Sequence, residues 1–190
     1  GDLGMLALGL VVAGLFSGLV AGMLGVGGGI VVVPVLYQVL AMHGVDPALR
    51  MHVAVGTSLA TIIPTSISSV RSHDRKGAVD WALLRSWVAP MVVGVAIGSA
   101  LGGLASGATL SLLFVVVAVP VAFYLAFGSE NRRLADHVPQ GPAGLLVPGG
   151  IGGLSTMMGI GGGAMGVPAM TLCGVPIHRA IRTAAAFGTI

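Results

Sequence analysis

The sequence predicts an all-α protein, a polytopic transmembrane helical bundle with two inverted repeats and helices broken by glycine and proline. Three observations predict it: few charged residues, long uncharged stretches and a duplicated glycine motif. Of the 190 residues, 55% are hydrophobic and only 8% are Asp, Glu, Lys or Arg. A soluble domain carries about 25% charged residues, and so few charges could not cover the surface of a soluble fold of this size.

The uncharged stretches provide room for a series of membrane crossings, each of which needs about 20 residues. Residues 3–42 have room for two crossings and residues 51–70 for one. Residues 86–129 and 138–177 fit two crossings each, and an eighth segment begins at Thr183.

Basic residues predict how these segments are oriented. They flank the gaps after the third and fifth segments, and basic loops stay on the cytoplasmic side. We therefore divide the chain into a first transmembrane module with connecting helices (1–127), a cytoplasmic loop (128–142) and a second module (143–190) whose pattern is incomplete. Arg50 falls on the other side, as an exception.

A duplicated motif is the most informative feature of the chain. Gly-x-Gly-Gly-Gly with a downstream proline occurs at residues 25–34 and again at 159–168. A second element, Ala-x-Arg followed by Gly-Thr, occurs at residues 48–57 and 180–189. Five predicted segments separate equivalent positions, and an odd number reverses the direction across the membrane. The copies should therefore be inverted repeats, which with broken helices are typical of secondary transporters.

We interpret each glycine run as a break in a membrane helix. The first helix should restart near Gly29 or Ile30, with Pro34 tolerated in its first turn. Unpaired amides and the positive end of the helix dipole bind anions. Two such ends that meet from opposite leaflets would hold one small anion at the bilayer midplane. The alternative interpretation is that the runs are tight packing turns, because small residues let transmembrane helices approach closely.

Other glycines repeat at intervals of four, which predicts helix packing and no ligand site. They are Gly14, Gly18 and Gly22, then Gly98 and Gly102, and then Gly149 and Gly153.

Hydroxyl side chains crowd the third predicted segment. The hydroxyls of Thr57 and Ser58 could bind an oxyanion or could bond to the helix carbonyl one turn back, and we weigh the two roles evenly. For Thr61 and Thr65 we favour the helix carbonyl. The candidate substrate-binding residues are Gly25, Gly27, Gly28, Gly29, Pro34, Thr57, Ser58, Gly159, Gly161, Gly162, Gly163, Pro168 and Thr189.

Three ionisable residues near the predicted membrane faces are candidates for a vestibule or a proton site. They are Arg50, His52 and Arg182, for which ordinary anchoring at the interface is the favoured alternative.

The sequence does not predict an enzyme. Every predicted membrane segment lacks Asp and Glu, and no nucleophile–base pair is apparent. The single cysteine, Cys173, excludes an internal disulfide. We therefore expect no catalytic residue, no cofactor and no bound metal.

The paired motif resembles the TauE/SafE family of sulfite-exporter-like permeases, and the resemblance covers essentially the whole chain. It implies a multi-pass protein of the bacterial inner membrane that exports sulfite, organosulfonates and related anions. We accordingly expect a transporter that works by alternating access and whose partners are a small anion and lipid. We expect no nucleic acid, and a homo-oligomer stays open. Family members continue past the second Gly-Thr element, where this chain ends.

Two alternatives remain at the level of the sequence. The protein could be a structural or accessory membrane subunit, or an anion channel, and its glycines would then serve helix packing only.

Overall fold

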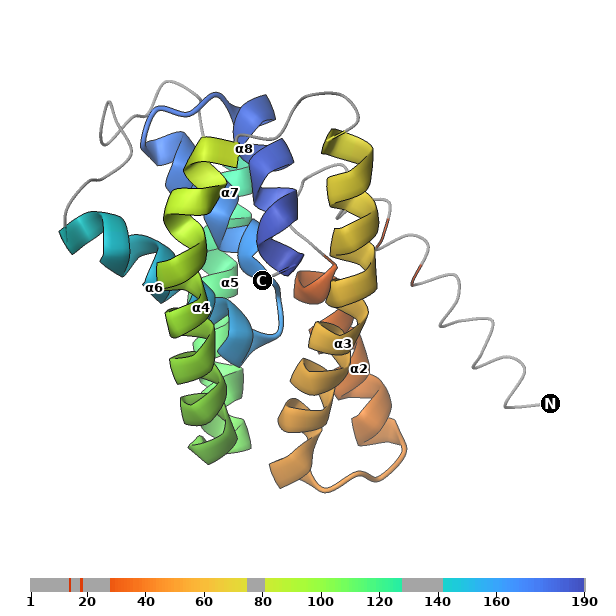
Figure 1. Ribbon diagram of the computed structural model, residues 1–190. Helices are drawn as coiled ribbons and strands as arrows, with labels where there is room; N and C mark the ends of the chain where they lie inside the picture. The colour runs from red at the N-terminus through yellow and green to blue at the C-terminus, as the bar shows by residue number, and fades with distance from the viewer. Residues whose placement is uncertain (1–13, 15–17, 19–27, 75–80, 128–141, 190) are drawn as a thin grey trace.

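The computed structural model describes residues 14, 18, 28–74, 81–127 and 142–189, and this part of the chain contains helices and no strand (Figure 1). The helices are α2 (Gly29–Met42), α3 (Pro47–Asp74), α4 (Trp81–Leu104), α5 (Gly107–Phe127), α6 (Pro142–Met158), α7 (Gly162–Leu172), α8 (Ile177–Ala184) and the 3-10 helix η1 (Ala185–Thr189). The predicted all-α membrane bundle is confirmed.

Three of these helices are long and apolar enough to cross a membrane. They contain the segments Pro47–Arg71, Leu83–Leu104 and Gly107–Tyr124. In contrast, α7 has 11 residues and is about 16 Å long at 1.5 Å per residue, roughly half of a hydrocarbon core of about 30 Å.

Residues 138–177, which were predicted to hold two segments, contain α6 and α7, and the glycine run separates them as expected. Of these two helices, α7 is too short to cross the membrane alone. The last segment also begins earlier than predicted, at Ile177.

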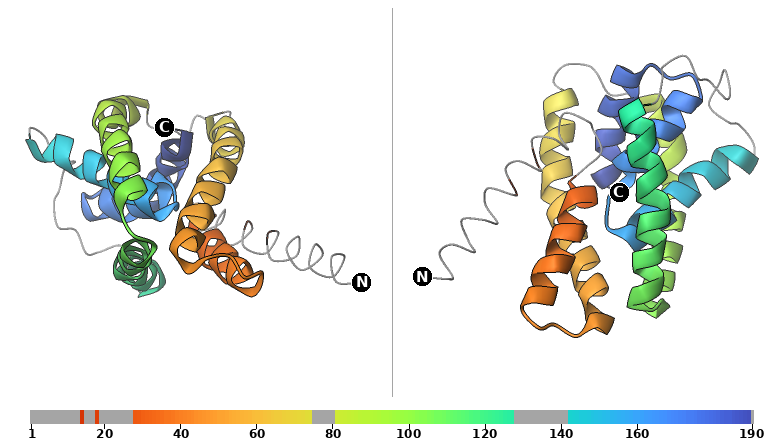
Figure 2. Two further views of the ribbon diagram at one scale, coloured as in Figure 1. Left: turned by 90° about the horizontal axis from the view of Figure 1, so that it is seen from below. Right: turned by 180° about the vertical axis from the view of Figure 1, so that it is seen from behind.

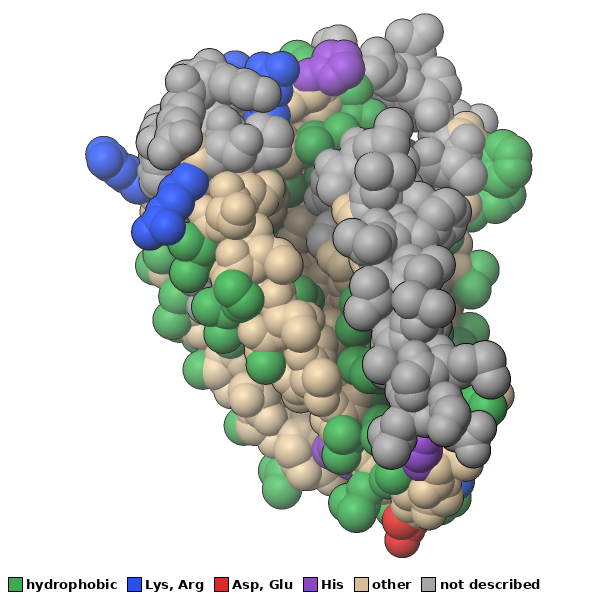
Figure 3. Space-filling model, turned by 90° about the vertical axis from the view of Figure 1, so that its right-hand side faces the viewer, with side chains coloured by type: hydrophobic (Ala, Val, Ile, Leu, Met, Phe, Trp, Pro, Cys, Tyr) green, Lys and Arg blue, Asp and Glu red, His purple; other side chains and the backbone are tan. Residues whose placement is uncertain are grey.

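The ends of the bundle differ in charge. The α2–α3 and α4–α5 turns lie at one end, while the end of α3, the start of α4 and the α7–α8 turn lie at the other (Figure 1). Arg71, Arg85 and Arg179 belong to the second group of segments, whereas Arg50 begins α3 near Asp46. Figure 3 shows basic side chains gathered at one end and an acidic side chain at the opposite end. For the described residues this separation agrees with the predicted one, and its cytoplasmic assignment stays a prediction. Residues 128–141 of the predicted cytoplasmic loop lie outside the described residues.

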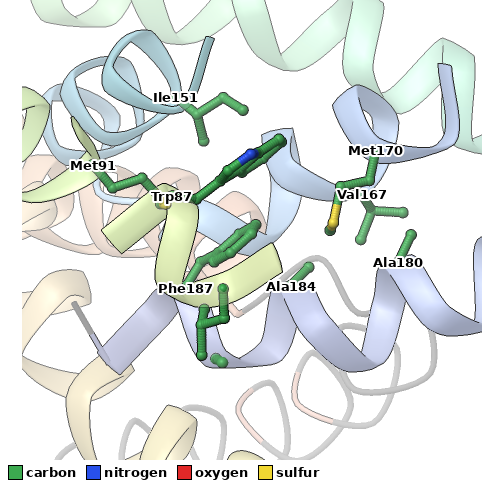
Figure 4. Close-up of a cluster of buried hydrophobic side chains, with 10 residues drawn as sticks. Trp87, Met91, Ile151, Val167, Met170, Ala180, Ala184 and Phe187 are labelled. Atoms are coloured by element: carbon green, nitrogen blue, oxygen red, sulfur yellow. The ribbon is translucent and has the colours of Figure 1, made fainter. Parts of the chain in front are cut away.

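An aromatic pair joins the end of the chain to the bundle. The rings of Trp87 and Phe187 stack with centroids 5.5 Å apart and planes 16° apart, within a buried cluster that also contains Met91, Ile151 and Val167 (Figure 4). η1, which carries Phe187, lies between α3 and α4 (Figure 2).

Glycine lets α4 and α6 pack backbone to backbone. A Cβ built on Gly98 would lie 2.6 Å from the Cα of Gly153, and one built on Gly94 would lie 2.7 Å from the carbonyl carbon of Gly149. Because such approaches exclude any side chain, the packing role predicted for Gly98, Gly149 and Gly153 is confirmed.

For two other glycines of that prediction, the described residues show no close approach. A Cβ on Gly14 or Gly18 would meet no atom within 4 Å, and both residues are exposed. Gly22 lies outside the described residues.

The α2–α3 and α7–α8 turns share one construction that the sequence analysis missed. Gly44 and Gly174 have φ values of 70° and 81°, and their N–H groups donate to Ala41 O and Thr171 O. The helices before these turns, α2 and α7, run from the middle of the molecule toward opposite ends (Figure 1). The opposed directions are those that inverted repeats require, while the symmetry itself stays a prediction.

Candidate functional site

The two glycine runs touch each other in the middle of the molecule. Gly29, the buried first residue of α2, packs against Gly159 and Ile160 of the second run. A Cβ at Gly29 would overlap the carbonyl oxygen of Gly159 and the Cα of Ile160. The fold therefore places the start of α2 against the break that precedes α7.

The second run is a break in the helix, as predicted. α6 ends at Met158 and α7 begins at Gly162. Gly159 and Gly161 both have a φ of 68°, a region that glycine adopts without the steric cost of a Cβ. Gly161 occupies the N-cap of α7 and, having no side chain, leaves the helix start without a side-chain cap.

The first run is described only from Gly28 onward. α2 begins at Gly29, as predicted, while Gly25 and Gly27 lie outside the described residues. Gly28 is the N-cap, with φ −64° and ψ −18°. Among the described atoms, a Cβ there would meet only the Cγ2 of Val32, at 3.7 Å. Of these two residues, Gly29 is thus the one that the packing requires to be glycine.

The two prolines lie deeper in their helices than expected. Pro34 and Pro168 are inside α2 and α7, five and six residues after their first residues. The expectation that Pro34 belongs to the first turn is therefore wrong. Pro168 is buried and Pro34 is exposed.

One face of α3 holds the second break in place. Val55, Ser58 and Ile62 are spaced three and four residues apart and so share a helix face. The hydroxyl of Ser58 donates to the Gly159 carbonyl oxygen at 2.6 Å and is fully buried. Ile62 lies against Gly161, where a Cβ would be 3.4 Å from its Cδ1.

This bond separates the two hydroxyls that the sequence analysis treated alike. Ser58 bonds to the other glycine run, which is neither of the two roles considered for it. Thr57 is exposed. The local bonds favoured for the later threonines are confirmed: Thr61 donates to Ser58 O at 2.8 Å, and Thr65 lies 2.9 Å from Thr61 O.

Part of the second run serves packing. Gly162 and Gly163 are buried, and a Cβ at Gly162 would lie 2.7 Å from the Cβ of Phe187 and 2.9 Å from the Cε of Met91. At Gly162 the packing interpretation therefore holds, because the missing side chain makes room for Phe187. Thr189 belongs to η1, but its side chain is outside the described part.

The vestibule candidates bond to turns at the ends of helices. The Arg50 Nε donates to Val45 O at 2.6 Å. The His52 Nδ1 is 3.2 Å from Ala48 O, and its Nε2 is 3.1 Å from Ala105 O. A neutral imidazole donates one of these bonds and an imidazolium donates both. The contacts of Arg50 and His52 suit the anchoring role. The third candidate, Arg182, is exposed on α8.

One polar residue near the break was missed. Ser155, on α6, is 3% exposed, and its hydroxyl has no hydrogen-bond partner among the described residues. Ser155 and its neighbour Thr156 match no site motif in the sequence, so only burial reveals Ser155. Among the described residues there is also no group of three His, Cys, Asp or Glu side chains that could hold a metal ion.

The chain has clear relatives among curated proteins, each named a probable membrane transporter protein. One from Haemophilus influenzae is 32% identical over 95% of this chain and 68% of its own length. One from Methanocaldococcus jannaschii is 27% identical over 90% of this chain and 64% of its own length. YunE of Bacillus subtilis is 28% identical over 86% of this chain and 66% of its own length. The chain thus spans about two thirds of the length of these relatives. No solved structure matches it.

The family match includes both glycine runs. It extends over residues 10–190 and carries the description Sulfite exporter TauE/SafE. Together with the apolar helices and the transporter relatives, this match shows that the chain is a membrane protein of the TauE/SafE sulfite exporter family.

Proposed function

We propose that this chain forms the core of a transporter that exports small sulfur-containing anions, such as sulfite or organosulfonates, across a bacterial inner membrane by alternating access. The observation that carries the proposal is the contact between the two glycine runs, at Gly29 and Gly159. The family description supplies the class of anion.

The chemistry of the site follows from helix ends that no side chain caps. Neither α2 nor α7 has a side-chain hydrogen bond at its N-cap, so first-turn amides and the positive dipole end remain available to an anion. Non-helical backbone at membrane depth survives only inside protein or beside a water-filled cavity. A break that lies between helices and faces a solute meets this condition.

The same contacts indicate how the site would open. In the described state, Gly29 touches the second break and Ser58 bonds to Gly159 O. A movement of the α2–α3 hairpin relative to α7 would separate these contacts and expose both helix starts to one side. Alternating access would then be a rocking of one module against the other around the breaks.

Flux of radiolabelled sulfite in proteoliposomes tests the transport proposal. A carrier gives saturable uptake that internal unlabelled sulfite accelerates by counterflow. Conductance that does not saturate would instead favour an anion channel, and absence of flux would favour an accessory or structural subunit.

A variant of Gly28 tests whether the amides bind the anion. Gly28→Val places a side chain at the α2 start where the described atoms leave space for it, the nearest being 3.7 Å from the new Cβ. We expect the protein to fold and sulfite uptake to fall. Gly103→Val, on an exposed glycine of α4 with no atom within 4 Å, is the matched control. Unchanged uptake by a folded Gly28→Val protein would refute the amide site.

A further inference from the structure

We propose that the hydroxyl of Ser155 is a ligand of the transported oxyanion, acting beside the first turn of α7. The inference rests on the proposed function and adds to it a side-chain donor from α6, the helix before the break.

The hydroxyl stands out because it is buried and has no hydrogen-bond partner in the part of the chain that the structure describes. Three hydroxyl residues are fully or almost fully buried in the described part of the chain: Ser58, Ser155 and Thr183. Ser58 donates to Gly159 O, and Thr183 also has a bonding partner. A buried donor left unsatisfied is costly, so a buried hydroxyl without a partner indicates that something else occupies its hydrogen bond in the working protein.

Ser155 belongs to the part of α6 that shapes the break. Its carbonyl oxygen accepts the N–H of Ile160 at 3.2 Å, which closes the last turn of α6 immediately before Gly161. The residue is therefore joined to the glycine run by the backbone as well as by its position one turn earlier.

The helix face that carries Ser155 packs against α4 close to the break that precedes α7. Residues three or four positions away share its face. Ile151 belongs to the same buried cluster as Met91 and Val167 (Figure 4). Gly152 lies against the backbone of Met91, where a Cβ would be 2.5 Å from the Met91 carbonyl oxygen.

Residues on both sides of Ser155 thus connect this face to α7. On its C-terminal side, Met158 packs with Ala164 in the first turn of α7. Met91, on the N-terminal side, also reaches Gly162, since a Cβ there would be 2.9 Å from its Cε. Ser155 thus lies one turn after Gly152, which packs on Met91, and Met91 in turn reaches the uncapped start of α7.

This arrangement suits an oxyanion. A serine hydroxyl donates one hydrogen bond, and the first-turn amides of α7 add further donors. Hydrogen bonds to a charged group are stronger than those between neutral groups, more so away from water. The hydroxyl would therefore bond to one oxygen of the anion while the α7 amides bond to another.

The test compares two neighbouring hydroxyls on α6. Ser155→Ala removes the unpartnered hydroxyl. Thr156→Ala removes a hydroxyl that donates to Gly152 O at 2.8 Å and is therefore already satisfied by its own helix. Sulfite affinity of the purified protein is measured by titration calorimetry, and the midpoint of thermal unfolding is recorded without anion.

We expect Ser155→Ala to weaken sulfite binding by about 10- to 100-fold. Its unfolding midpoint without anion should be equal to or higher than that of the wild type, because an unsatisfied buried group has been removed. Thr156→Ala should keep the wild-type affinity.

Sulfite binding that is the same in Ser155→Ala and wild type would overturn the inference and leave the proposed transport standing. A changed unfolding midpoint with unchanged affinity would overturn it as well, since the hydroxyl would then serve stability only. If the wild type neither binds nor moves sulfite, the proposed function itself fails, and this inference fails with it.

Discussion

Replacing Gly29 by alanine adds one methyl group at the contact between the two glycine runs. The new Cβ would lie less than 3.0 Å from the carbonyl oxygen of Gly159 and the Cα of Ile160, whereas ordinary contacts begin at 3.4 Å. To bring the Cβ from less than 3.0 Å to 3.4 Å, the backbone would have to move by more than 0.4 Å. Both neighbours are backbone atoms, so no side chain can rotate away.

We expect this overpacking to destabilise the protein by about 1–3 kcal/mol. For a chain of this size that lowers the unfolding midpoint by roughly 2–12 °C. Gly28→Ala is the matched control, because among the described residues its Cβ would meet only Val32, at 3.7 Å. It should change stability by at most about 0.5 kcal/mol. Thermal unfolding in detergent measures both. Equal midpoints for the two variants would refute the contact between the runs.

Three further predictions follow from the described contacts. Gly98→Ala should destabilise the protein by about 1–3 kcal/mol because the new Cβ meets Gly153 backbone atoms. Gly103→Ala, with open space around it, should be neutral or stabilising by up to about 1 kcal/mol. Thermal unfolding in detergent compares the two variants, and equal losses of stability would contradict the α4–α6 packing. Ser58→Ala should cost about 1–3 kcal/mol in the same assay, since a buried carbonyl loses its donor; an unchanged midpoint would count against that bond. In a background where the native cysteine is replaced by serine, an impermeant maleimide applied to intact cells should label the Asp46→Cys variant. The Arg85→Cys variant should be labelled only after the cells are permeabilised. Labelling of both variants in intact cells would reject the predicted topology.

Much of the architecture could be predicted from the sequence because bilayer constraints act on composition. With 8% charged residues in 190, the chain has few side chains suited to water, and a helix is the structure that satisfies its own backbone in lipid. The restart of helices at Gly29 and Gly162 was also predictable, because runs of glycine resist helix formation and recur with a proline. The same recurrence was sufficient to identify the family.

Contacts between segments far apart in the sequence could not be predicted in this way. Whether a glycine faces a ligand, a ring or another backbone depends on what lies opposite, and the structure places Gly29 against Gly159 and Phe187 over Gly162. Ser58 and Thr57 are adjacent in sequence, but only Ser58 is buried. Neighbours on a helix point about 100° apart, so packing alone assigns their roles.

Residue type and periodicity thus determined by themselves that this chain is a helical membrane protein, and they predicted the helix break at the second glycine run. Only the tertiary structure decided that Gly29 meets the second break, that α7 is too short to cross the membrane alone and that the Ser155 hydroxyl is buried without a partner among the described residues. The physical reason is that hydrophobicity and backbone propensity are local properties of the chain. Close approach and unsatisfied burial exist only between segments that folding brings together.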